Sequence, residues 1–195
     1  MIEKFYPVVP NADWVARLAP AGARFIQLRI KDQPDAELRR QVREAQAVCV
    51  AHGAQLIVND YWRIAIDEKC PWVHLGQEDL VDADVKAIRR AGLLLGVSTH
   101  DHAELDKGLA VDPDYVALGP IWPTLLKKMP WAPQGLDRIG EWKRLVGKKP
   151  LVAIGGLTLE RAKLCLAAGA DSAAVVGDVV NHADPIGQTK AWLQL

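Results

Sequence analysis

The chain has 195 residues, half of them apolar, and its 24 basic side chains balance its 24 acidic ones. This length predicts a single domain over residues 1–195. The balanced charge argues against nucleic-acid binding, and the short apolar runs argue against a membrane protein. Because the three cysteines form no CxxC motif and the first residues do not resemble a signal peptide, we expect a cytoplasmic protein.

Eight short runs rich in Val, Ile and Leu recur along the chain. Most of them lack strict alternation of apolar and polar residues, which is typical of strands that are buried on both faces. The predicted strands cover residues 5–9, 24–28, 55–58, 72–75, 93–97, 115–118, 151–154 and 172–176.

Stretches with helical periodicity lie between these runs. The clearest is 35–52, where Leu38, Val42 and Cys49 share one face. The others cover residues 82–91, 102–110, 136–146, 158–168 and 185–193. Glycines expected to end helices follow three of them, at Gly53, Gly92 and Gly169. Strand alternating with helix predicts an α/β protein with a parallel sheet, and about eight repeats favour a closed (β/α)8 TIM barrel in a short form.

Polar residues end the second predicted strand, in the run Gln27-Leu28-Arg29-Ile30-Lys31. Because strand side chains alternate, Gln27, Arg29 and Lys31 share one face, which in a barrel points into the mouth. Two cations and an amide there suit an anionic ligand, since Arg binds phosphate bidentately and Lys adds a point charge. The alternative is a frayed strand end with solvated charges.

Two aspartates follow the third and fourth predicted strands. Asp60 ends the run Asn59-Asp60, and Asp79 lies just beyond His74. Two carboxylates beside a cationic patch suit Mg²⁺, which binds one or two carboxylates together with substrate phosphates. The alternative is that both aspartates cap the helices that follow.

Other candidates lie at the ends of later strands. Ser98 follows the fifth strand, and its hydroxyl could bind phosphate or cap a helix. His74 and His100 could act as acids or bases, but a histidine inside a barrel is as often a satisfied polar residue, so neither is assigned proton transfer. The long segment 119–135 contains four prolines and two tryptophans, which is typical of a loop that covers an active site.

Glycines follow the last two strands. Gly155 and Gly156 follow the seventh strand, and Gly177 follows Val176 at the end of the eighth. Backbone N–H groups at this place in a barrel commonly bind phosphate, although a Gly-Gly pair can also be a plain tight turn. The sequence therefore predicts two anion sites, one cationic and one built from backbone amides.

Taken together, several segments resemble the thiamine phosphate synthase family in order and spacing. They are QLRIK (27–31), VND (58–60), HLGQEDL (74–80), GVSTH (96–100), ALGPIWPT with a following Lys (117–127), QGL (134–136) and AIGG (153–156). The resemblance covers nearly the whole chain. It implies a barrel enzyme that joins 4-amino-2-methyl-5-hydroxymethylpyrimidine diphosphate to 4-methyl-5-(2-phosphoethyl)thiazole and releases pyrophosphate.

The resemblance also implies roles for individual residues. Asp60 and Asp79 would bind Mg²⁺. The pyrimidine diphosphate would be held by Gln27, Arg29, Lys31, Asn59, Ser98 and Lys127, with His74 also at the substrate. The predicted catalytic residues in this set are Arg29, Lys31, Ser98 and Lys127. The thiazole phosphate would be held by Thr124, Gly155 or Gly156, and the backbone of Val176 and Gly177.

The chain departs from the family pattern on the thiazole side. Leu126 replaces a hydroxyl residue in the T-x-T-K loop motif, and Gly177 stands where a serine is usual. Three alternatives therefore stay open: a thiazole tautomerase-like paralogue, a non-catalytic protein that binds thiamine phosphates, and another phosphate-handling barrel enzyme such as an epimerase. No nucleic-acid or membrane partner is expected, and the sequence leaves homo-oligomer formation open.

Overall fold

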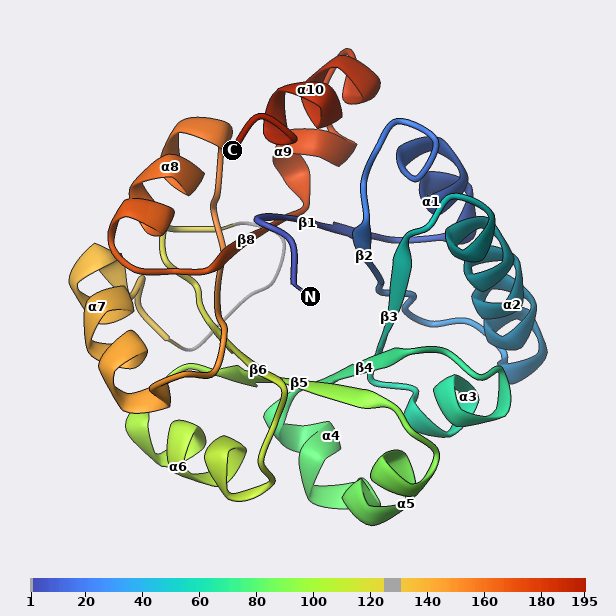
Figure 1. The fold of residues 1–195 in the computed structure, drawn as a ribbon, viewed down its shortest axis with the longest axis horizontal. Coiled ribbons are helices and arrows are strands. Elements are labelled where there is room, and N and C mark those ends of the chain that lie inside the picture. The colour runs from blue at the N-terminus through green and yellow to red at the C-terminus, as the bar shows by residue number, and fades with distance from the viewer. Residues whose placement is uncertain (1, 125–130) are drawn as a thin grey trace.

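The computed structural model describes residues 2–124 and 131–195. Eight parallel strands form a closed barrel in sequence order, and β1 pairs with β8 to complete it (Figure 1). The strands are β1 (Phe5–Val9), β2 (Phe25–Leu28), β3 (Gln55–Asn59), β4 (Trp72–Leu75), β5 (Leu94–Thr99), β6 (Tyr115–Leu118), β7 (Leu151–Ile154) and β8 (Ser172–Val175). The predicted TIM barrel is confirmed.

Helices surround the barrel on its outside (Figure 1). In the described part of the chain they are α1 (Ala12–Leu18), α2 (Asp35–Ala51), α3 (Trp62–Asp67), α4 (Gln77–Asp82), α5 (Val85–Arg90), α6 (His102–Ala110), α7 (Gly135–Val146), α8 (Leu159–Ala167), α9 (Gly177–Val180) and α10 (Pro185–Trp192). None of these helices combines the length and the apolar composition needed to cross a bilayer.

The helix prediction for residues 82–91 was wrong at its start. Two helices divide that region, because α4 ends at Asp82 and α5 begins only at Val85. Asp84 caps α5, since its side chain accepts a hydrogen bond from Ala87 N at 2.8 Å. The cap starts a new helix and separates it from α4.

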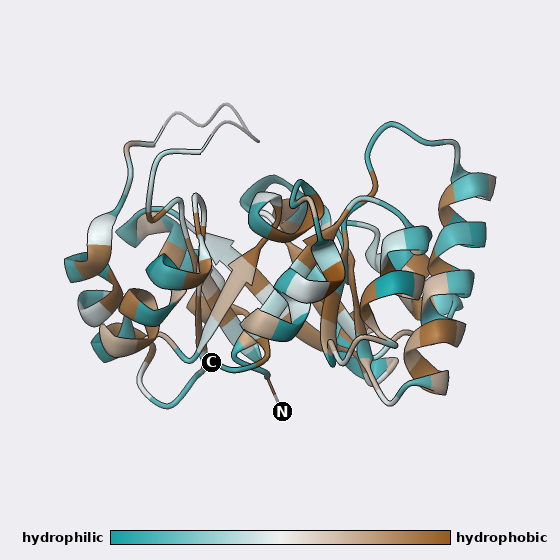
Figure 2. Ribbon diagram, turned by 90° about the horizontal axis from the view of Figure 1, so that it is seen from above, coloured by the Kyte–Doolittle hydropathy of each residue, from teal (hydrophilic) through white to brown (hydrophobic). Residues whose placement is uncertain are grey.

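The core has two parts. A large cluster fills the space between barrel and helices, and the outward side chains Ile26, Leu28 and Ile30 belong to it. A second cluster fills the barrel interior and is rich in aromatic rings, including Tyr6, Phe25, Trp72 and Tyr115. The apolar residues of the strands lie in the middle of the molecule, and the helices carry hydrophilic residues on their outer faces (Figure 2). The predicted alternation of β2 is therefore confirmed.

Both chain ends lie at one end of the barrel (Figure 2). The Lys4 ammonium donates a hydrogen bond to the carbonyl oxygen of Leu195 at 2.7 Å, so the residue that precedes β1 contacts Leu195. The loops that follow the strands lie at the opposite end of the barrel, where the carboxyl ends of the strands are.

Candidate active site

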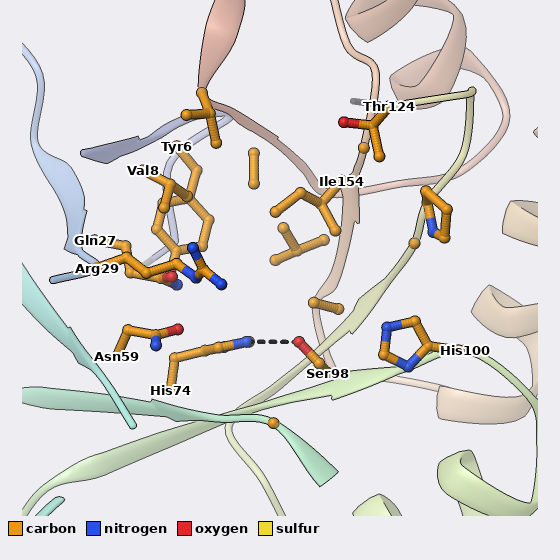
Figure 3. Close-up of a pocket in the computed structure, with 18 of the residues that line it drawn as sticks. Tyr6, Val8, Gln27, Arg29, Asn59, His74, Ser98, His100, Thr124 and Ile154 are labelled. Carbon is orange, nitrogen blue, oxygen red and sulfur yellow. Dashed lines mark hydrogen bonds between the residues drawn. The ribbon is translucent and has the colours of Figure 1, made fainter. Parts of the chain in front are cut away.

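A cavity of about 600 Å³ opens at the carboxyl ends of the strands. Side chains from opposite walls of the barrel converge on it (Figure 3). Every predicted site residue that the structure describes lines this cavity: Gln27, Arg29, Lys31, Asn59, Asp60, His74, Asp79, Ser98, Thr124, Gly155, Gly156, Val176 and Gly177. Lys127 and Leu126 lie outside the described residues.

The cationic wall comes from β2 and the residues after it. Gln27 is buried, and its alternate neighbours Arg29 and Lys31 point to the same cavity. The Arg29 amide donates to the Val9 carbonyl at 2.8 Å, which extends the pairing of β1 and β2 beyond the ends of the strands. The guanidinium is thus carried on an ordered backbone.

The two aspartates lie together at the mouth. Lys31 Nζ donates to Asp60 Oδ2 at 2.7 Å. Partial burial and the neighbouring Asp60 charge raise the pKa of Asp79 above its ordinary value, whereas Lys31 opposes that rise. Neither aspartate is an N-cap, because Tyr61 occupies that position in α3 and Gly76 in α4. The capping alternative is therefore excluded.

This pair fits a divalent cation. Asp60 has a φ of 66°, in the left-handed region that few side chains adopt, and this turns the chain immediately after β3. Asp79 lies in the first turn of α4. Asp60 and Asp79 would hold the ion, and its positive charge would offset the Asp60 repulsion that adds to burial in raising the Asp79 pKa; hard oxygen ligands are those Mg²⁺ prefers.

Asn59 offers a hydrogen-bond donor to the cavity. It is 5% exposed, and its Nδ2 has no partner within the described residues. An unpaired buried donor typically costs about 1–3 kcal/mol. A ligand acceptor beside Asn59 would remove that cost, as expected for a residue that contacts a heteroaromatic ring or a phosphate.

His74 lies between the cavity and the barrel interior. Its Nε2 lies 2.8 Å from Ser98 Oγ, and its Nδ1 lies 2.7 Å from Tyr115 Oη (Figure 3 shows the former bond). Burial, supported by the Arg29 charge and opposed by Asp60, lowers the pKa of His74 to about 4. The imidazole is therefore neutral at physiological pH and is held by two partners.

The glycine turn after β7 packs against the loop after β6. Gly155 has a φ of 101°, and a Cβ on it would lie 2.6 Å from the Pro120 Cα. Gly156 has a φ of 65°, and its Cβ would lie 2.5 Å from the Pro123 carbonyl oxygen. Only glycine fits this close approach, which brings Thr124 to the cavity beside the turn.

Sequence reasoning missed several residues of the cavity wall. Tyr6 reaches it from β1, and Trp131 stacks on His100 with ring centroids 4.0 Å apart. Glu104 accepts from the backbone N–H of His100 at 2.8 Å and lies 2.6 Å from its ring. The i,i+4 spacing of His100 and Glu104 was an available signal, and Trp131 belongs to the segment 119–135 that was expected to cover the site, whereas nothing local in the sequence marks Tyr6.

Comparisons with known proteins agree with this geometry. Residues 5–179 match the family model described as thiamine monophosphate synthase. The thiamine-phosphate synthase of Rhizobium etli is 60% identical over 98% of this chain and 94% of that protein. The enzyme of the same name from Cronobacter sakazakii is 51% identical over 97% of this chain and 90% of its own length.

A solved structure shows the same likeness. The thiamine phosphate pyrophosphorylase from Pyrococcus furiosus superposes with a TM-score of 0.85 at 26% identity, covering 98% of this chain and 93% of that one. A 3-hexulose-6-phosphate synthase superposes with a TM-score of 0.70 at 18% identity, covering 98% of this chain and 99% of the other, which shows the fold alone. By its sequence, its barrel and its cavity, this chain belongs to the thiamine phosphate synthase family.

Proposed function

We propose that this chain is a transferase that makes thiamine phosphate. It would couple 4-amino-2-methyl-5-hydroxymethylpyrimidine diphosphate to 4-methyl-5-(2-phosphoethyl)thiazole and release pyrophosphate. The observation that carries the proposal is the convergence of Arg29, Lys31, Asp60 and Asp79 on one cavity, since this set suits a diphosphate bound with a divalent cation. The 60% identical relative supports the same activity.

The diphosphate would bind on the β2 side. Arg29, Lys31 and Lys127 would bind its oxygens, and Asp60 and Asp79 would hold Mg²⁺. When bound, Mg²⁺ would supply charge neutralisation to the leaving diphosphate. Asn59, Gln27 and Ser98 would orient the pyrimidine diphosphate through hydrogen bonds.

The chemistry then needs no protein nucleophile. The bond between the pyrimidine methylene carbon and the diphosphate oxygen breaks, and the electron pair leaves with the diphosphate. The electron-rich aminopyrimidine carries the resulting cation until the thiazole nitrogen donates its electron pair to that carbon. The protein would hold both substrates in line, and its cations would stabilise the charge that develops on the leaving group.

The thiazole phosphate would bind at the opposite wall. Thr124 and the turn at Gly155 and Gly156 lie there, together with the backbone of Val176 and Gly177. Backbone N–H groups at this turn would replace the hydroxyls that Leu126 and Gly177 lack. We further propose action in the cytoplasm; assembly into a homo-oligomer stays an open prediction.

The direct test is turnover. Purified protein is mixed with both substrates and Mg²⁺, and thiamine phosphate and pyrophosphate are measured. We expect equal amounts of the two products and loss of turnover when EDTA removes the metal. Absence of product at every Mg²⁺ concentration would overturn the proposal, and binding of thiamine phosphate in such a protein would identify a non-catalytic binder instead.

A thiazole tautomerase-like activity is the other enzymatic candidate. Such a paralogue has no use for cations and carboxylates that bind diphosphate, and this chain retains Arg29, Lys31, Asp60 and Asp79 at the cavity. Isomerisation of the thiazole carboxylate phosphate in the same assay would favour the paralogue.

A further inference from the structure

A chain of hydrogen bonds crosses the barrel just below the cavity. Gln27 Nε2 donates to Tyr6 Oη at 2.6 Å, and Tyr6 Oη lies 2.7 Å from Tyr115 Oη. Tyr115 Oη lies 2.7 Å from His74 Nδ1, and His74 Nε2 lies 2.8 Å from Ser98 Oγ. These hydrogen bonds therefore connect two cavity residues, Gln27 on β2 and Ser98 on β5, whose strands are not neighbours in the barrel.

Protons are donated along these hydrogen bonds in a preferred direction. A glutamine amide nitrogen can only donate, so Tyr6 Oη accepts from Gln27. If Tyr6 gives its single proton to Tyr115 and Tyr115 gives its own to His74, both phenol protons have acceptors, and the proton left over is that of Ser98, which is only partly buried. In the reverse direction the Tyr6 proton has no acceptor among the described residues, and Tyr6 is only 1% exposed. A buried unpaired O–H is costly, which favours the first arrangement.

The direction determines the tautomer of His74. A neutral imidazole has one N–H and one acceptor nitrogen. If Nδ1 accepts from Tyr115, the proton lies on Nε2 and is donated to Ser98 Oγ. The Ser98 hydroxyl then keeps its own proton, which is free to point to the cavity that Ser98 lines.

A single glycine makes this series of hydrogen bonds possible. Gly96 lies between His74 and Tyr115 in the strand register, since it pairs with both of them. A Cβ at Gly96 would lie 2.0 Å from Tyr115 Cζ and 2.4 Å from Tyr115 Oη. The tyrosine can therefore cross β5 and stack beside the His74 ring only because residue 96 has no side chain.

We propose that Tyr6 and Tyr115 are positioning residues that direct the Ser98 hydroxyl proton to an acceptor on the substrate. This inference rests on the proposed function, in which that acceptor is an oxygen of the diphosphate. The oxygen gains negative charge as its bond to carbon breaks, so a fixed donor stabilises the transition state more than the bound substrate. The phenols also fix the imidazole against rotation, so Ser98 has one orientation before substrate binds.

The first experiment reads the tautomer in the substrate-free protein. The five histidines are labelled with ¹⁵N, and the His74 nitrogens are assigned by their loss in His74→Gln. We expect an unprotonated Nδ1 and a protonated Nε2 in the wild type. A protonated Nδ1 would overturn the proposal. In Tyr115→Phe the donor to Nδ1 is gone, and a share of the Nδ1–H tautomer should appear.

Tyr61→Phe is the matched control for that spectrum. It removes the third tyrosine hydroxyl of the chain, which lies 3.5 Å from the Ile30 carbonyl and outside the hydrogen-bond chain. The His74 signals should not change in this variant. A change equal to that in Tyr115→Phe would show a general loosening of the barrel and would count against the proposal.

The second experiment separates positioning from folding. In an active protein we expect Tyr115→Phe to lower kcat about tenfold and to change KM for the pyrimidine diphosphate less than about threefold. In a Ser98→Ala background the same substitution should change kcat less than about twofold, because the group on which Tyr115 acts is already absent. An equal loss in both backgrounds would overturn the proposal.

The two experiments fail independently. Should Tyr115→Phe not fold, Tyr6→Phe serves the same cycle, and the wild-type tautomer alone still decides the direction of the chain. Should the protein make no thiamine phosphate, the proposed function falls, while the nitrogen spectrum still tests the hydrogen-bond arrangement.

Discussion

Asp79 is the residue at which the metal proposal can be tested most directly. Asp79→Asn removes one of the two proposed Mg²⁺ ligands and keeps the size of the side chain. We expect kcat to fall about a hundredfold or more, because charge neutralisation of the leaving group is worth several kcal/mol. The measurement is steady-state turnover at saturating Mg²⁺.

The thermal stability of Asp79→Asn, measured with and without Mg²⁺, is a second test of metal binding. Because burial and Asp60 raise the Asp79 pKa, the ionised form is disfavoured in the folded protein, and a neutral Asn should not lower the Tm without metal. Mg²⁺ should raise the Tm of the wild type and not of Asp79→Asn. Asp82→Asn, an exposed change in the same helix, is the control and should keep the Mg²⁺ response. Full activity in Asp79→Asn would refute the assignment.

At the level of single residues, the sequence could predict what alternation and strand ends determine. Gln27, Arg29 and Lys31 share a face because successive strand side chains alternate, and Asp60 reaches the mouth because it ends a strand. The Tyr6–Tyr115 contact joins residues 109 positions apart, so no local pattern marks it.

Strand β5 depends on a residue with no side chain. In Gly96→Ala the new methyl group would overlap the Tyr115 ring, so the ring must move and its hydrogen bonds to Tyr6 and His74 must weaken. We expect a loss of about 1–3 kcal/mol in the free energy of unfolding, as is typical of overpacking. Urea denaturation followed by tryptophan fluorescence would measure it.

Gly140→Ala is the matched control for that substitution. Gly140 lies inside α7, and a Cβ there would meet its nearest neighbour, the Ala168 carbonyl oxygen, at 3.7 Å. Because alanine favours helix over glycine, this change should leave stability unchanged or raise it by up to about 1 kcal/mol. If both variants lost the same stability, the steric account of Gly96 would be wrong.

Strands and helices were predicted correctly where the hydrophobic run or the helical periodicity was long. The eight strands were found within two residues of their observed ends, and α2 within one. The short helices α1, α3, α4 and α9 were missed, because four to seven residues make too few turns to show periodicity. Asn11, whose side chain accepts from Trp14 N, was a usable start signal for α1.

The three cysteines come from separate parts of the chain, and the folded barrel buries all of them as free thiols. Burial raises the pKa of Cys49, Cys70 and Cys165 to about 12. The folded protein should therefore react negligibly with a thiol reagent such as DTNB at pH 8, and all three groups should react in denaturant. Rapid labelling of one cysteine under native conditions would show that its cover opens.

The same shifts predict how stability depends on alkaline pH. An unfolded thiol ionises near a pKa of about 8.5, whereas the folded thiols stay neutral to about pH 12. The contribution of the neutral buried thiols to the free energy of unfolding is complete below about pH 8.5 and is lost as the pH rises toward 12. Chemical denaturation between pH 7 and 10 should show this decline, and replacing Cys165 by Ala should make it less steep.

The contact between Lys4 and the final residue has a practical consequence for engineering. Because Lys4 and Leu195 meet on the side of the barrel away from the cavity, a short linker could join the ends of a polypeptide of residues 4–195, which could then be opened elsewhere as a circular permutant. A new opening after the exposed Gly53, on that same far side, should leave the pocket intact.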